Sequence, residues 1–143
     1  MGDRVVAEYM TDVGWRYLGL WRAVGTGLIM VVVFLTLASA PIVEGIVEIN
    51  DKIGHFIAYA TLMGWHAQYI GRDTRSQWAV GFVAMGVVLE LLQGASGWRT
   101  MDVADIVANS TGVVAGAIVS VFGCAGWLRR LDNALARIGG RWP

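Results

Sequence analysis

The sequence is poor in cysteine, lysine and charge. It contains one cysteine and one lysine among 143 residues, and only 15% of its residues are charged while 56% are hydrophobic. A single cysteine, Cys124, excludes an intramolecular disulfide and any metal site built from several cysteines. No basic stretch carries interleaved aromatic residues, so no nucleic-acid partner is expected. With a mean hydropathy of +0.56, the composition is typical of a protein embedded in a bilayer rather than of a small soluble domain.

Four apolar segments divide the chain, each close to the roughly 17–25 residues that a transmembrane helix requires. They lie at about 23–40, 53–70, 78–94 and 105–127. We therefore predict an all-α, polytopic membrane protein in which residues 1–143 form one domain, a bundle of four transmembrane helices. Ala38-Ser39-Ala40 resembles a signal-peptidase cleavage site, but the acidic residues before the first segment and the proline directly after it favour a retained span.

Both ends of the chain mix charged residues with apolar residues near helical spacing. Residues 1–22 predict an amphipathic helix along the membrane surface, with a frayed terminus as the alternative. Residues 127–143 predict a second, basic surface helix. The positive-inside rule places both termini and most arginines in the cytoplasm, and it leaves only Lys52 and Arg99 outside.

Polar residues gather where this topology places the outer ends of the last three segments. They are Asp51, Lys52, His55, Glu90, Gln93, Arg99, Asp102, Asp105 and Asn109. Asp102, Asp105 and Asn109 stand at i, i+3 and i+7, on one face of a helix. Because a helix rises about 1.5 Å per residue, the deepest of these groups lie within roughly 10 Å of the outer interface. Ionisable residues at such depth are costly and usually mark a functional site.

Two interpretations of these polar residues do not involve catalysis. In the first, the residues line an outward-facing cleft that binds a polar or lipid-linked headgroup. Lys52 and Arg99 then hold phosphate, while Gln93 and Asn109 hold hydroxyls or amides. In the second, the same charges form an internal ion-pair network with a structural role.

A third interpretation is catalytic. His55, Glu90 and Asp105 are the candidate catalytic residues, with His55 as a general base for hydrolysis or group transfer. No nucleophile follows a recognisable pattern, since the sequence around Ser96 breaks the G-x-S-x-G motif at its last position. A metal site from His55, Glu90, Asp102 and Asp105 is chemically permissible. The two nearby cations would compete for the carboxylates, so we predict no metal and no cofactor.

Small residues continue the polar face of the fourth segment. Gly112, Gly116 and Ser120 follow at helical spacing, and the pair Gly112-x-x-x-Gly116 indicates close helix packing, either inside the bundle or between protomers. Gly81 and Gly86 favour similar packing in the third segment. Homo-oligomerisation through glycine-rich helix faces is therefore a further prediction.

The polar residues also carry a resemblance to a known family. Their motifs read Asp51-Lys52…His55, then Glu90…Gln93, then Arg99…Asp102…Asp105…Asn109…Gly112. In this order and spacing they resemble the VanZ-like family of small bacterial membrane proteins, over about residues 51–120. The resemblance implies a place in the bacterial inner (cytoplasmic) membrane and a role in the cell envelope. The founding member of that family is associated with antibiotic resistance, to the glycopeptide teicoplanin.

We therefore expect an integral membrane protein that binds an envelope component on its extracytoplasmic side. A lipid-linked glycan, a peptidoglycan precursor or a glycopeptide antibiotic would fit. Membrane lipids are the general partners and a lipid-linked precursor is the specific one. Two alternatives stay open: a membrane-embedded hydrolase or transferase acting on a lipid-linked substrate, and a structural scaffold held by its ion pairs.

Overall fold

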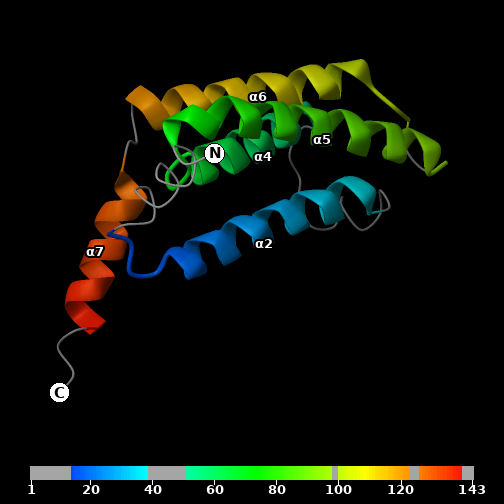
Figure 1. Cartoon of the computed structure of the whole chain (residues 1–143). Coiled ribbons are helices and arrows are strands. Elements are labelled where there is room, and N and C mark those ends of the chain that lie inside the picture. The colour runs from blue at the N-terminus through cyan, green and yellow to red at the C-terminus, as the bar shows by residue number, and fades with distance from the viewer. Residues whose placement is uncertain (1–13, 39–50, 98–99, 123–125, 140–143) are drawn as a thin grey trace, which may run out of the picture.

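The computed structural model describes residues 14–38, 51–97, 100–122 and 126–139 (Figure 1). All regular secondary structure in these residues is helical. The elements are α2 (Leu18–Leu37), α4 (Asp51–His66), the short 3-10 helix η1 (Arg72–Thr74), α5 (Arg75–Ala95), α6 (Val103–Phe122) and α7 (Trp127–Gly139). Most of the predicted N-terminal surface helix lies outside the described residues. So do Cys124 and most of the stretch between the first two predicted spans.

Three of these helical segments are long and apolar enough to cross a membrane: α2, η1 together with α5, and α6. Their outer faces carry bulky exposed side chains, such as Phe34 on α2, Val80 on α5 and Ile118 on α6. An extended apolar surface of this kind is typical of helices that face lipid. The prediction of an all-α fold is confirmed for the described residues, and three of the four predicted spans correspond to helices suited to crossing a membrane.

The first two predicted spans have different boundaries in the structure. The first was placed at 23–40, whereas α2 begins at Leu18 and ends at Leu37. The second was placed at 53–70, whereas α4 ends at His66 after 16 residues. The chain then turns through shorter-range bonds, with the Tyr69 N–H donating to the His66 carbonyl at 3.2 Å. The apolar segment predicted at 53–70 therefore extends beyond the end of α4.

The last predicted span ends earlier in the structure than predicted. It was placed at 105–127, but α6 begins at Val103 and ends at Phe122, and the basic surface helix predicted at 127–143 corresponds to α7. Gly126, immediately before α7, has a φ of +75°, a conformation that a residue with a Cβ adopts at a steric cost. Hydropathy alone placed the end of the span too late, because small and apolar residues continue past Phe122 as far as Leu128. The third predicted span, 78–94, lies wholly within α5.

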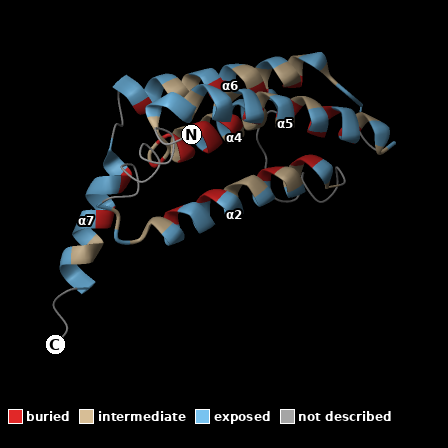
Figure 2. Cartoon of the chain, in the orientation of Figure 1, coloured by how far each residue is buried: buried red, intermediate tan, exposed pale blue. Residues whose placement is uncertain are grey.

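Helices α4, α5 and α6 lie side by side, and α2 runs along α4 and α5 (Figure 1). Successive helices alternate in direction, so the start of α4, the end of α5 and the start of α6 meet at one end of the bundle. The buried face of each helix turns toward the others (Figure 2). The main apolar core comprises Val32, Tyr59, Leu62, Met63, Ala67, Phe82 and Val113.

The closest packing in the bundle is between α4 and α6. A Cβ built on Gly112 would collide with the carbonyl oxygen of Phe56, and one built on Gly116 would collide with that of Ala60. The two backbones touch at these glycines, as small-residue helix contacts in membranes allow. Gly112 and Gly116 are therefore used inside the chain. Of the two glycines predicted to act in α5, Gly86 is packed and Gly81 has open space beside it.

Helix α7 is held to the start of α2 by one fully buried carboxylate, that of Asp132. It accepts hydrogen bonds from the backbone N–H groups of Arg16 and Tyr17, at 2.8 and 2.9 Å, and from the indole N–H of Trp21 at 2.7 Å. Burial alone would raise the pKa of Asp132, but these three donors, together with the Arg129 charge, hold it below its ordinary value. This contact fixes the amphipathic C-terminal helix against the bundle.

Candidate functional site

The polar residues singled out in the sequence meet at the end of the bundle opposite α7. Helix α4 contributes Asp51, Lys52 and His55 from its first two turns. The residues of this polar cluster that the structure describes are Asp51, Lys52, His55, Glu90, Gln93, Asp102, Asp105 and Asn109. Four of them, Glu90, Gln93, Asp105 and Asn109, are buried. Arg99, also predicted here, lies outside the described residues.

Lys52 forms two close ion pairs in the cluster. Its Nζ lies 2.5 Å from Oδ2 of Asp102 and 3.2 Å from Oδ1 of Asp105. The hydrogen bond from Lys52, followed by one from the Ala104 N–H at 2.8 Å, holds the pKa of Asp102 below its ordinary value. Lys52 was predicted to bind phosphate, yet its ammonium is already engaged by two carboxylates.

Asp102 makes hydrogen bonds that link α4, α5 and α6. It immediately precedes α6, and its Oδ1 accepts the Ala104 N–H as the N-cap of that helix would. Its own backbone N–H donates to Oε1 of Glu90 at 2.7 Å, which links it to α5. Its other carboxylate oxygen binds Lys52 of α4. Glu90, a candidate catalytic acid or base in the sequence, thus has one oxygen engaged in holding the loop that enters α6.

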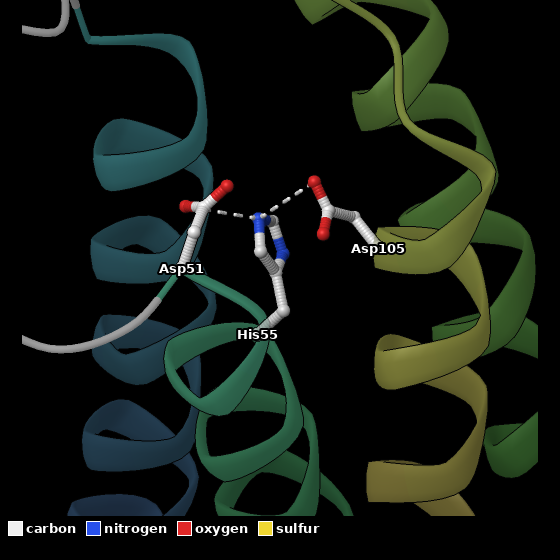
Figure 3. A group of neighbouring side chains, drawn as sticks. All are labelled: Asp51, His55 and Asp105. Carbon is white, nitrogen blue, oxygen red and sulfur yellow. Dashed lines mark ion pairs between the residues drawn. The ribbon is translucent and has the colours of Figure 1, made fainter.

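His55 has a defined orientation. Its Nδ1 lies 3.1 Å from the amide oxygen of Asn109, and because that oxygen only accepts, Nδ1 carries the proton. Its Nε2 therefore faces Oδ1 of Asp51 at 3.8 Å and Oδ2 of Asp105 at 3.9 Å (Figure 3). Both distances exceed those of a hydrogen bond. The three side chains approach one another without direct bonding.

Exposure differs across this group. The side chain of Asp105 is 5% exposed and that of His55 is 10% exposed, whereas that of Asp51 is 52% exposed. The group is therefore closed by α6 on one side and accessible from the first turn of α4. The side chains of Asp51, His55 and Asp105 could hold a metal ion, since their ligand atoms all lie within 4.8 Å of one another.

Tyr59 belongs to this site and was missed in the sequence analysis. It lies one helical turn after His55, is 1% exposed, and has no hydrogen-bond partner for its hydroxyl within the part of the chain that the structure describes. A Cβ built on Gly86 would come within 3.1 Å of the Asn109 amide nitrogen and 3.3 Å of the Tyr59 Cζ. The i+4 spacing of Tyr59 from His55 was the signal available in the sequence.

The hydroxyls near the cluster do not support a nucleophile. Ser96 donates to the Gln93 carbonyl at 2.6 Å, and Ser110 donates to the Ile106 carbonyl at 2.8 Å. Thr111 also donates to carbonyls of its own helix. Each is bonded as an ordinary helical side chain. The second histidine, His66, is buried at the far end of α4, where its Nδ1 bonds the Leu62 carbonyl.

No protein-family model, no curated protein and no solved structure matches this chain. The resemblance to the VanZ-like family therefore rests on the motif residues alone.

Proposed function

We propose that this chain is a four-span protein of the bacterial inner membrane whose polar cluster binds the hydrophilic part of an envelope component on the extracytoplasmic side. The observation that carries the proposal is the burial of two carboxylates and two amides, from α5 and α6, among helices that suit a bilayer. Such groups are expensive to place there. An apolar helix bundle does not need such groups in order to pack, whereas recognition of a polar ligand does need them.

The fourth span would be α4. It contacts α2, α5 and α6, the helices suited to the bilayer, and its exposed residues Ile53, Phe56 and Ile57 are apolar. The orientation follows from the arginines at the α7 end of the bundle. They include Arg16, Arg22, Arg72, Arg75, Arg129, Arg130 and Arg137. The positive-inside rule then places that end in the cytoplasm and the polar cluster outside.

The chemistry of the cluster favours a ligand rich in donors. Carboxylates supply most of its polar atoms, and carboxylates accept hydrogen bonds from hydroxyl and ammonium groups. Sugars and peptides offer such groups, as in a lipid-linked glycan, a peptidoglycan precursor or a glycopeptide antibiotic. Phosphate recognition would depend on Arg99, because Lys52 is paired with Asp102 and Asp105. The motif resemblance to VanZ-like proteins points to the same class of envelope ligand.

Native mass spectrometry of the full chain, purified in mild detergent, tests the proposal. We expect the wild-type protein to retain an adduct with the mass of a lipid-linked headgroup. Glu90→Gln should lose the adduct and keep its melting temperature, because the amide oxygen can still accept the Asp102 N–H. Asp73→Asn changes an exposed carboxylate in η1 and is the matched control that should retain the adduct.

Two results would contradict a binding role. A bare wild-type protein would leave no ligand to recognise, and a Glu90→Gln protein that fails to fold would favour the internal ion-pair network. Conversion of the retained adduct to a second mass over time would instead support the hydrolase or transferase alternative.

A further inference from the structure

The first turns of α4 and α6 bring together three metal-ligating atoms. Nε2 of His55 lies between Oδ1 of Asp51 and Oδ2 of Asp105, at 3.8 and 3.9 Å (Figure 3). Zinc binds histidine nitrogen and carboxylate oxygen at about 2.0–2.2 Å, so two ligands of one ion lie roughly 3–4 Å apart. The observed spacings are too long for hydrogen bonds and close to those of atoms that share an ion.

We propose that Asp51, His55 and Asp105 bind one divalent transition-metal ion of the zinc class. One nitrogen and two carboxylate oxygens form a donor set that suits such an ion, whereas calcium and magnesium prefer oxygen alone. This proposal goes beyond headgroup binding and does not depend on it, because the ion would bind in the absence of any envelope component.

The residues around the three ligands hold them as the outer partners of metal sites do. Asn109 accepts the Nδ1 proton of His55, which fixes the tautomer whose Nε2 lone pair faces the carboxylates. Lys52 binds Oδ1 of Asp105 and leaves Oδ2 directed at His55. From its sequence position Lys52 was expected to compete for the carboxylate, but its Nζ lies on Oδ1 of Asp105, the oxygen that the ion would not use.

A buried polar group without a hydrogen-bond partner in the described part of the chain lies beside Asn109, the outer partner of His55. The Tyr59 hydroxyl is deeply buried without a hydrogen-bond partner among the described residues, and buried tyrosine hydroxyls usually have one. The hydroxyl-bearing carbon of Tyr59 and the amide nitrogen of Asn109 both pack against Gly86. The layer next to Asn109 therefore holds a polar group that the described residues leave unsatisfied.

The site is accessible to an ion. Asp51 is half exposed while Asp105 is buried, so an ion would enter past the first turn of α4. The competing explanation is a protonated His55 that pairs electrostatically with both carboxylates. That arrangement would bind no ion, and a metal titration separates the two.

The experiment is a titration of the EDTA-treated full chain in detergent with Co²⁺, followed by visible absorption and by competition with Zn²⁺. We expect one equivalent of Co²⁺ to bind with ligand-field bands that Zn²⁺ abolishes. His55→Ala should remove the bands. Asn109→Ala, which removes only the outer partner, should weaken binding by about 10–100-fold. Asp73→Asn is the matched control and should bind as the wild type does.

Asp51→Asn keeps the test decisive if a buried substitution fails to fold, because Asp51 is exposed. It should weaken Co²⁺ binding by at least about 10-fold with the melting temperature unchanged. Equal titration of wild type and Asp51→Asn, or no Co²⁺ bands in the wild type, would overturn the metal site. Because the titration contains no lipid, its failure would leave the lipid adduct of the preceding experiment to stand or fall separately.

Discussion

Asp132, where α7 meets α2, and Asp105, where α6 meets α4, are buried carboxylates at opposite ends of the molecule. Asp132 accepts hydrogen bonds from three donors at 2.7–2.9 Å. Oδ1 of Asp105 lies 3.2 Å from Nζ of Lys52, which also pairs with Asp102. Oδ2 of Asp105 lies 3.9 Å from Nε2 of His55. Burial is costly for both carboxylates, and among the described residues Asp132 accepts three close hydrogen bonds whereas Asp105 accepts one longer side-chain bond, from Lys52. We interpret Asp132 as a structural carboxylate and Asp105 as a ligand of the proposed ion.

The largest expected effect comes from removing the structural carboxylate. Asp132→Ala leaves the Arg16 and Tyr17 N–H groups and the Trp21 indole without their acceptor. We expect the free energy of unfolding to fall by about 3 kcal/mol, measured by denaturation in detergent with tryptophan fluorescence. Asp73→Ala, at an exposed position, should change it little. A loss below about 1 kcal/mol for Asp132→Ala would remove the distinction between the two ends.

A smaller effect should appear on acidification. The folded pKa of Asp132 lies below its unfolded value, so its contribution is complete above the ordinary aspartate pKa of about 3.9 and is lost as the pH falls through the lower folded value. We expect the melting temperature of the wild type to decline below about pH 4 more steeply than that of Asp132→Asn. Parallel pH profiles would show that the depressed pKa does not stabilise the fold.

The smallest effect is expected at Tyr59. Its hydroxyl has no hydrogen-bond partner among the described residues, so Tyr59→Phe should leave the free energy of unfolding unchanged or raise it by up to about 1 kcal/mol. Thermal denaturation in detergent measures this directly. A loss of more than about 1 kcal/mol would show that the hydroxyl is bonded within the fold, and the end near Asp105 would then resemble the end near Asp132.

The buried face of α6 could be predicted largely from helical periodicity. Residues 105, 109, 112, 116 and 120 were placed near one face by their spacing, and the structure buries all five. A regular helix projects sequence distance directly onto a face, so this inference needs no tertiary information. The same periodicity could not show that the helix ends at Phe122, because the residues directly after it, Gly123-Cys124-Ala125, are also small or apolar.

Two other features had no comparable signal. The partners of Asp132 include backbone N–H groups more than a hundred residues away in the sequence. Because nearly every residue has a backbone N–H, the side chains of these partners do not predict the contact. Tyr59 reads as an apolar core residue in the sequence, and the main core does include it. Its role near Asn109 depends on the space left by Gly86, which only the packing of α5 against α6 creates.

The glycine contact between α4 and α6 has a consequence for the site above it. Gly112 touches the carbonyl of Phe56, and Phe56 directly follows His55 while Gly112 lies one turn after Asn109. The separation of the two helices at that level is therefore limited by backbone against backbone, which cannot be compressed or rearranged as side chains can. The gap between His55 and Asp105 is thus set by residue 112, one that touches neither. A single methyl group added there would push α4 away from α6 and change the spacing of the proposed ligand atoms, without altering any of the residues that carry them.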